Sequence, residues 1–146
     1  EALAAPERNT VLLIGDLAFA HDATALSCQL GVALTIVLVD NGGGGIFGQL
    51  PIANHPELFE RLFLTPQSLG HEATSLAAGA EYTVAGDLQQ LRAELERPQT
   101  GVRVVRLPID RQRSDDCRRD AIARVADALG ERRSACDDGR ATQGAR

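Results

Sequence analysis

Four runs of mostly apolar residues recur along the chain and predict four β-strands. The second run, LTIVLV at residues 34–39, is almost continuously apolar, which is typical of a parallel strand covered on both faces. The first run, TVLLI, is likewise predicted to be a buried strand and is followed by Gly15-Asp16. The predicted strands cover residues 10–14, 34–39, 81–85 and 102–107.

Helical patterns fill the intervals between these runs. Asp22 and Asp87 are predicted as N-caps, because an aspartate side chain can accept hydrogen bonds from the first N–H groups of a helix. Gly31 and Gly79 are predicted to end two helices, since glycine readily adopts the left-handed conformation that closes a helix. The predicted helices cover residues 22–30, 58–63, 71–78, 87–97 and 115–129. This alternation predicts an α/β fold, a doubly wound and mainly parallel sheet with helices on both faces.

The chain of 146 residues has the size of one domain with flanking segments. Residues 1–9 are predicted to be a linker or the remnant of a preceding domain, and residues 10–130 to form the domain. The polar segment 131–146 is predicted to be disordered. Methionine is absent, even at position 1, which predicts that the chain begins inside a longer gene product or has been processed.

Charge and cysteine content exclude several classes of function. The net charge of −5 argues against nucleic-acid binding, which depends on attraction to phosphates. All 15 basic residues are arginine, so no catalytic lysine is available. No apolar run approaches the length of a membrane span. An odd number of widely spaced cysteines argues against a disulfide framework and favours the cytoplasm; they are Cys28, Cys117 and Cys136.

Two strand ends carry the candidate chemistry. Gly15-Asp16 follows the first strand, and Asp40-Asn41 with four glycines follows the second. Neighbouring parallel strands bring their carboxyl ends to one edge of the sheet, where such sheets bind ligands. A carboxylate, a carboxamide and a glycine carbonyl there would suit Mg²⁺, and a bare glycine backbone would approach a diphosphate closely. Each of the two motifs alone, Gly15-Asp16 or Asn41-Gly42, is also a common turn signal. The two motifs together favour a metal–diphosphate site.

These motifs resemble a known signature. Gly15-Asp16, an intervening helix and Asp40-Asn41 resemble the Gly-Asp-Gly…Asn-Asn signature that binds diphosphate in thiamine diphosphate enzymes. Leu17, in place of the last glycine of the first motif, is typical of one family, MenD, the 2-succinyl-5-enolpyruvyl-6-hydroxy-3-cyclohexene-1-carboxylate synthases. Three stretches that span much of the chain resemble that family, namely GDLAFAHDATAL, LTIVLVDNGGGGIFGQLPIA and FERLFLTPQ.

The resemblance implies a fold, an activity and partners. The chain would have the thiamine diphosphate-binding fold and form the C-terminal domain of a three-domain enzyme. Enzymes of the family bind thiamine diphosphate and Mg²⁺, decarboxylate 2-oxoglutarate and add the succinyl unit to isochorismate in menaquinone biosynthesis. The catalytic glutamate that activates the cofactor lies on a domain, in a partner subunit, that this chain lacks. The resemblance therefore implies a cytoplasmic homodimer or homotetramer, and no activity for the isolated chain.

Site residues follow from the resemblance position by position. Asp16 and Asn41 would bind Mg²⁺ through their side chains, and Gly43 through its carbonyl. Asp40 stands where the family usually has Asn. The other cofactor-binding residues fall into two groups. Those along the diphosphate would be Gly15, Leu17, Ala18, Gly44 and Gly45. Three apolar residues would lie near the substrate, namely Ile46, Phe47 and Leu50.

Other conspicuous side chains are interpreted structurally. His55 and His71 lie in loop or helix-start contexts and are predicted to be solvated. Phe59 and Phe63 stand at helical spacing, which predicts a role in the core or in an interface between domains.

Three alternatives compete with this assignment. Another thiamine diphosphate carboligase or decarboxylase, such as an acetolactate synthase-like enzyme, would usually keep a glycine at the position of Leu17. A nucleotide-binding Rossmann domain would need Gly-x-Gly-x-x-Gly directly after the first strand, and LIGDLAFAHD does not provide it. A truncated, non-catalytic binding or oligomerisation module is the third alternative, which an upstream pyrimidine-binding domain would exclude.

Overall fold

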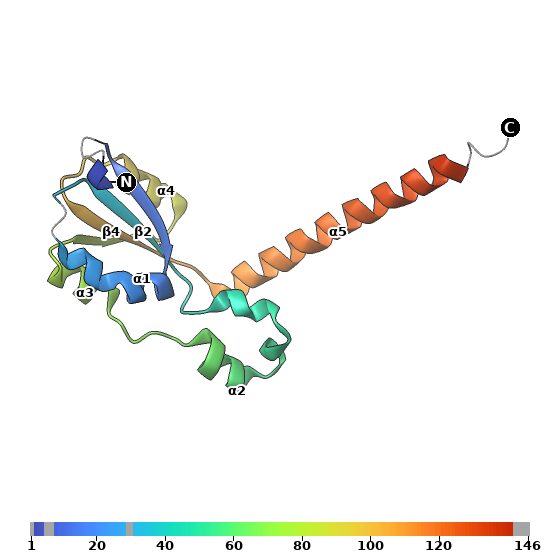
Figure 1. The fold of residues 1–146 in the computed structure, drawn as a ribbon, viewed down its shortest axis with the longest axis horizontal. Coiled ribbons are helices and arrows are strands. Elements are labelled where there is room, and N and C mark those ends of the chain that lie inside the picture. The colour runs from blue at the N-terminus through green and yellow to red at the C-terminus, as the bar shows by residue number, and fades with distance from the viewer. Residues whose placement is uncertain (1, 5–7, 29–30, 142–146) are drawn as a thin grey trace. The chain divides into compact units, whose positions relative to one another are not determined.

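The computed structural model of the chain describes residues 2–4, 8–28 and 31–141. The chain forms two compact units, which are divided between Asp110 and Arg111. The first unit is an α/β domain, and the described part of the second is one helix (Figure 1).

Within the described residues, a parallel sheet of four strands forms the centre of the first unit. The strands are β1 (Thr10–Gly15), β2 (Leu34–Asp40), β3 (Glu81–Val84) and β4 (Val102–Pro108). Their order across the sheet is β1-β2-β4-β3, and all pairings are parallel. The predicted strands and the predicted α/β class are therefore confirmed.

Helices and short helical turns connect the strands. Two predicted helices are confirmed, α3 (His71–Ala77) and α4 (Leu88–Glu96). Gly79 follows α3 with φ +78°, and Asp87 caps α4 by accepting a hydrogen bond from the N–H of Gln90 at 2.8 Å. No helix in the described ranges is long and apolar enough to cross a membrane. The remaining elements of this unit are η1 (Ala2–Ala4), α1 (Asp16–Asp22), η2 (Ala23–Cys28), η3 (Gly45–Gln49), η4 (Pro51–Asn54), α2 (Pro56–Phe59) and η5 (Glu60–Leu64).

α1 and α4 pack on opposite faces of the sheet (Figure 1). The side chain of Arg103 in β4 donates to the carbonyl of Glu94 in α4, whereas the next residue, Val104, belongs to the same core cluster as Phe19 of α1. Successive residues of a strand point to opposite faces, so the two helices cover different faces. The expected covering of both faces is therefore present.

The prediction of a helix from Asp22 to residue 30 is wrong. α1 begins at Asp16 and ends at Asp22, and 3₁₀ turns continue to Cys28. Gly15 is extended, with φ −84° and ψ 164°, and the good helix formers of LAFA come just after Asp16. An aspartate in the first turn also interacts favourably with the helix dipole. Asp16 therefore begins the helix, and Leu30 lies outside the described residues.

The core lies along β2 and β4, where Leu38, Val104 and Val105 are fully buried. The prediction that the first strand is buried is wrong for most of its length. Leu13 is 71% exposed and Leu12 is 42% exposed. The reason is that, among the described strands, β1 is an edge strand and pairs only with β2.

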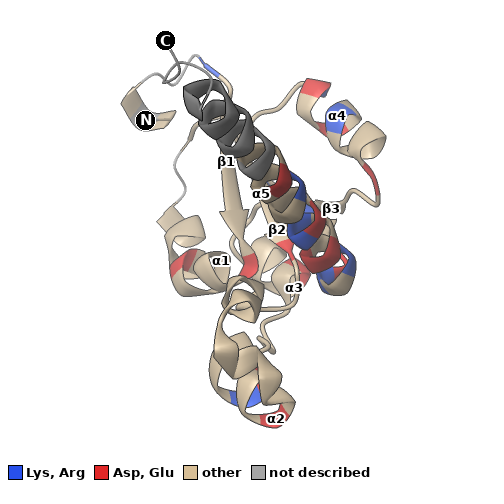
Figure 2. Cartoon of the chain, turned by 90° about the vertical axis from the view of Figure 1, so that its right-hand side faces the viewer, with Lys and Arg blue, Asp and Glu red and all other residues tan. Residues whose placement is uncertain are grey.

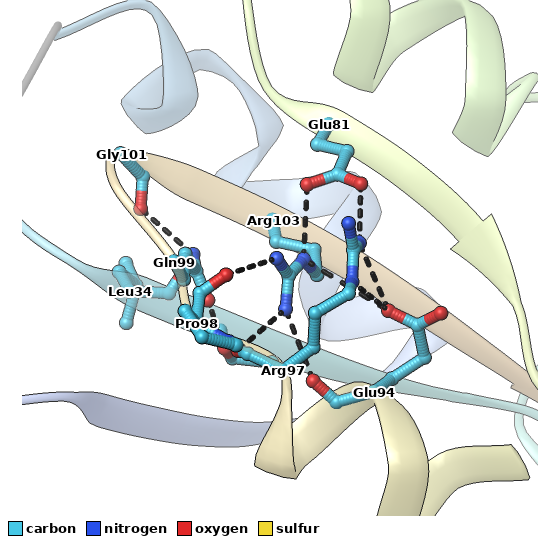
Figure 3. Close-up of polar contacts among 9 residues, drawn as sticks. Leu34, Glu81, Glu94, Arg97, Pro98, Gln99, Gly101 and Arg103 are labelled. Atoms are coloured by element: carbon cyan, nitrogen blue, oxygen red, sulfur yellow. Dashed lines mark hydrogen bonds and ion pairs between the residues drawn. The ribbon is translucent and has the colours of Figure 1, made fainter.

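A buried arginine joins β4 to β3 and to the end of α4 (Figure 3). The side chain of Arg103 is 2% exposed, and its Nε donates to Oε2 of Glu81 at 3.0 Å. Its terminal nitrogens donate to the carbonyls of Glu94 at 3.0 Å, Arg97 at 3.4 Å and Pro98 at 3.2 Å. Glu81 also forms an ion pair with Arg97. The buried charge is therefore offset by a carboxylate, and its other donors are satisfied by the main chain.

Acid is expected to weaken this network through Glu81. Hydrogen bonds from Arg97 and then from Arg103 lower the pKa of the Glu81 carboxyl below its ordinary value of 4.5. A carboxyl whose pKa is lower in the folded state contributes stability above the unfolded pKa and loses it as the pH falls through the folded pKa. The free energy of unfolding should therefore fall in acid below pH 4.5, and fall less in Glu81→Gln. The effect should be small because Glu81 is half exposed. Acid unfolding curves with the same pH dependence in both proteins would contradict this prediction.

The second unit contains α5 (Arg111–Ala141). The helix extends past residue 129, where the apolar pattern places its end, because the next residues include the helix formers Glu and Arg. Ion pairs within one turn join Asp115 to Arg118 at 2.8 Å and Asp116 to Arg119 at 3.3 Å, and Figure 2 shows charges of both signs on the helix. The predicted domain boundary near residue 130 stays a prediction.

Candidate functional site

The carboxyl ends of β1 and β2 lie side by side, as the sequence predicts. The two strands are parallel neighbours, with Gly15 opposite Val39. The main-chain N–H of Gly43 donates to Oδ2 of Asp16 at 2.6 Å. The glycine segment after β2 therefore reaches the aspartate that follows β1, and the two motifs meet at one edge of the sheet.

Asp16 is held in one orientation by the main chain. Only 5% of the residue is exposed. Oδ1 accepts a hydrogen bond from the N–H of Leu17 at 2.8 Å, while Oδ2 accepts the one from Gly43. Each carboxylate oxygen has a second lone pair, so Asp16 can also bind a cation.

Asn41 presents an oxygen that lacks a partner. Its Oδ1 is buried, and none of the described residues donates a hydrogen bond to it. A buried polar atom of this kind is uncommon and points to an ion or water. The carbonyl of Gly43 accepts from the N–H of Gly45 at 2.8 Å and keeps a second lone pair. Together with Asp16, these oxygens form a hard donor set that fits Mg²⁺.

Clusters of typical metal-binding side chains do not supply a site among the described residues. In the described part of the chain, no group of three or more His, Cys, Asp or Glu side chains could hold a metal ion. A cation at this edge would therefore depend on the single carboxylate of Asp16, on amide and carbonyl oxygens of the protein, and on oxygens of a phosphate ligand bound with it. That coordination is typical of Mg²⁺ bound together with a phosphate group.

A hollow of about 340 Å³ opens over these groups. It is lined by Val39 and by every predicted cofactor-binding residue except Gly45, which is buried. Ile46 and Phe47 form its apolar part and are 67% and 39% exposed. Leu50, predicted to lie near the substrate, is exposed but is not among the lining residues.

The glycines also allow two segments to approach closely. A Cβ on Gly43 would lie 2.1 Å from the carbonyl oxygen of Leu64, and one on Gly44 would lie 2.2 Å from that of Phe63. Gly43 has φ +124°, a conformation that favours glycine. The N–H of Gly44 donates to the carbonyl of Leu64 at 2.7 Å. Contact with η5 therefore requires the bare backbone, in addition to any role toward a diphosphate.

Aromatic rings extend this contact. Phe47 of η3 and Phe63 of η5 meet edge to face, with ring centroids 5.9 Å apart, and Phe59 stacks on Phe63 at 6.4 Å. These geometries are favourable for aromatic pairs. Phe59 and Phe63 therefore act as packing residues behind the glycine segment, in line with their structural interpretation.

Asp40 lies beside the site and belongs to a cluster that the sequence did not reveal. Its Oδ2 accepts from Nε of Arg106 at 2.6 Å, and its Oδ1 from the N–H of Gly42 at 3.1 Å. Nδ1 of His71 lies 3.6 Å from Oδ2, and this side chain is 13% exposed, so the prediction of a solvated His71 is wrong. Burial raises the pKa of the Asp40 carboxyl, but hydrogen bonds from Arg106 and Gly42 outweigh it and lower the pKa below its ordinary value. The sequence held one signal of the pair between Asp40 and Arg106, namely a basic residue near the end of a predicted neighbouring strand.

No protein-family model matches the chain. Among curated proteins it is 41% identical over 108 residues to the 2-succinyl-5-enolpyruvyl-6-hydroxy-3-cyclohexene-1-carboxylate synthase of Gloeothece citriformis. The synthases of the same name from Synechococcus elongatus and Chlorobium chlorochromatii are 37% identical over 127 residues and 55% identical over 73 residues. The chain belongs to this synthase family over the segment that it spans. The three matches cover 72%, 85% and 49% of the chain but only 19%, 22% and 12% of these MenD relatives.

A solved structure supports the fold of this MenD segment. The benzoylformate decarboxylase from Polynucleobacter necessarius matches it with a TM-score of 0.59 and 25% identity. The match covers 76% of this chain and 21% of that chain. Both comparisons therefore relate the chain to about a fifth of a longer protein, and the predicted family and fold are confirmed.

Proposed function

We propose that this chain is the C-terminal domain of a MenD-type synthase and binds thiamine diphosphate together with Mg²⁺. The observation that carries the proposal is the buried Oδ1 of Asn41, to which none of the described residues donates a hydrogen bond. Asn41 shares a hollow with the buried Asp16. A Mg²⁺ ion would satisfy that oxygen and offset the charge of Asp16. Membership of the synthase family supports thiamine diphosphate as the ligand that completes the site.

In this proposal, each part of the hollow has its own role. Asp16 and Asn41 hold Mg²⁺ through their side chains, and Gly43 holds it through its carbonyl. A diphosphate could approach the main chain of the glycine segment closely, because no side chain there would keep the ligand at a distance. The residues along the diphosphate would be Gly15, Leu17, Ala18, Gly44 and Gly45.

The apolar side of the hollow would act on the reacting part of the cofactor. Thiamine diphosphate, when bound, supplies the electron sink for decarboxylation of a 2-oxo acid. Ile46 and Phe47 would pack against it, fix its orientation and exclude water from the reacting atoms. Leu50 follows them on the exposed end of the same segment and would contact the substrate.

The proposed reaction is that of the whole enzyme. The relatives are named as synthases of a succinyl-bearing cyclohexene carboxylate, which supports transfer of a succinyl unit. The reaction that the family resemblance implies is decarboxylation of 2-oxoglutarate and addition of the succinyl unit to isochorismate, in menaquinone biosynthesis. The glutamate that activates the cofactor would come from another domain of a partner subunit, in a homodimer or homotetramer. Cys28 and Cys117 are both free thiols in the structure, which suits the reducing cytoplasm.

A second candidate is a thiamine diphosphate decarboxylase without an acceptor, which the similarity to benzoylformate decarboxylase favours. Both candidates can be tested on the native protein at its full encoded length. We expect CO₂ release from 2-oxoglutarate that needs both thiamine diphosphate and Mg²⁺, and succinyl transfer when isochorismate is added. CO₂ release from benzoylformate, without reaction of 2-oxoglutarate, would favour the second candidate. No reaction of either 2-oxo acid would favour a non-catalytic binding module.

A further inference from the structure

A second carboxylate stands next to the proposed metal–diphosphate site. Asp40 and Asp16 both line a second hollow, of about 450 Å³. A carboxylate close to a bound diphosphate repels it, and burial strengthens this repulsion because it reduces screening by water. The side chain of Asp40 is only 10% exposed. Its negative charge therefore has to be offset by the protein if the site is to accept an anionic ligand.

Arg106 supplies this compensation from the neighbouring strand. Its Nε donates to Oδ2 of Asp40 at 2.6 Å, the short distance of a charge-assisted hydrogen bond. The other carboxylate oxygen, Oδ1, accepts the N–H of Gly42 at 3.1 Å. The next residue, Gly43, donates to Asp16. A continuous path of hydrogen bonds and one peptide unit therefore runs from Arg106 through Asp40 to the carboxylate proposed to bind Mg²⁺.

We propose that Arg106 is a positioning residue for the metal–diphosphate site. It holds the Asp40 carboxylate toward β4 and neutralises it, so that Gly42 and Gly43 keep the orientation in which Gly43 meets Asp16. This inference rests on the proposed function, since it names a further residue of the same site.

The alternative role for Arg106 is to fasten the end of β2 to β4. The main chain already does this, because the two strands are paired up to Asp40 and Pro108 and the N–H of Ile109 donates to the carbonyl of Asp40 at 2.7 Å. The Arg106 side chain is 36% exposed, so its removal leaves no large cavity. Loss of Arg106 should therefore change ligand affinity more than stability.

The test is a double-mutant cycle in the native protein at its full encoded length, titrated with thiamine diphosphate at saturating Mg²⁺. Arg106→Ala should weaken binding about tenfold, the size of one hydrogen bond between charged groups. In the Asp40→Asn background, the same change should alter binding by no more than about twofold, because the carboxylate on which Arg106 acts is gone. Arg106→Lys, which keeps the charge, should restore part of the affinity. Thermal unfolding without ligand should show that every variant folds, with a modest loss of stability in Arg106→Ala, where Asp40 is left without its charged partner.

Two controls separate this inference from the proposed function. Arg92→Ala removes an exposed arginine whose partner is Glu96, and it should leave binding unchanged. Asp16→Ala should abolish Mg²⁺-dependent binding; if it does not, the proposed function fails. If Asp16→Ala abolishes binding but Arg106→Ala binds like the wild type, the inference alone fails. It also fails if Arg106→Ala weakens binding equally with Asp40 and with Asn at that position. Should Arg106→Ala not fold, Arg106→Gln gives the same decision with a side chain of similar length.

Discussion

Replacing Arg103 with alanine is expected to lower the free energy of unfolding of the sheet by about 3–5 kcal/mol, because three carbonyls lose their donor and a cavity is left. The side chain is 2% exposed and ties three elements together. Its loss would leave a cavity under α4 and would take the donor away from the carbonyls of Glu94, Arg97 and Pro98. Glu81 would keep its pair with Arg97, so the penalty comes mainly from the carbonyls and the cavity.

Hydrogen-exchange protection of the β3 and β4 amides in the native protein, measured over increasing urea, reports this loss locally. Arg92→Ala is the matched control, because Arg92 is also paired with a glutamate but is 80% exposed. It should cost about 0–1 kcal/mol, as exposed ion pairs do. A loss for Arg103→Ala no larger than that of Arg92→Ala would contradict the account of this network.

The sheet could be predicted because its strands are short apolar runs separated by helical patterns. The apolar pattern does not show how many neighbouring strands each strand pairs with. β1 looks as apolar as β2 in the sequence, yet Leu13 is mostly exposed because β1 lies at the edge. The start of α1 was misplaced for a local reason, since Asp22 and Asp16 are both plausible first residues of a helix. The extended Gly15 decides between them by ending β1 immediately before Asp16.

The candidate site was predictable where its residues follow two neighbouring strands. Asp16 and Asn41 could be placed at one edge from the order of elements alone. The contacts behind the site could not be predicted in this way, because they join distant segments. The glycine segment touches the main chain of η5 at Leu64, and Asp40 pairs with Arg106, 66 residues further along the chain. Packing in three dimensions, which no local pattern encodes, decides both contacts.

The second large effect is expected at Asp16. Its carboxylate is the charged ligand in the donor set of the proposed site, and the nearby carboxylate of Asp40 is held by Arg106. Asp16→Asn keeps the length of the side chain and one of its oxygens but removes the charge. We expect it to weaken binding of thiamine diphosphate in the presence of Mg²⁺ by about 100-fold or more, because Mg²⁺ is bound chiefly through carboxylate and phosphate oxygens. Asp22→Ala, at the exposed end of the same helix, is the matched control and should bind like the wild type.

The central claim is that the two strand ends form a site for a Mg²⁺-bound diphosphate. Calorimetric titration of the native protein with thiamine diphosphate, with and without Mg²⁺, tests this most directly when wild type, Asp16→Asn and Asp22→Ala are compared. We expect binding heat that needs Mg²⁺, persists in Asp22→Ala and disappears in Asp16→Asn. Absence of binding in the wild type, or binding that is equally strong without Mg²⁺ or in Asp16→Asn, would contradict this claim.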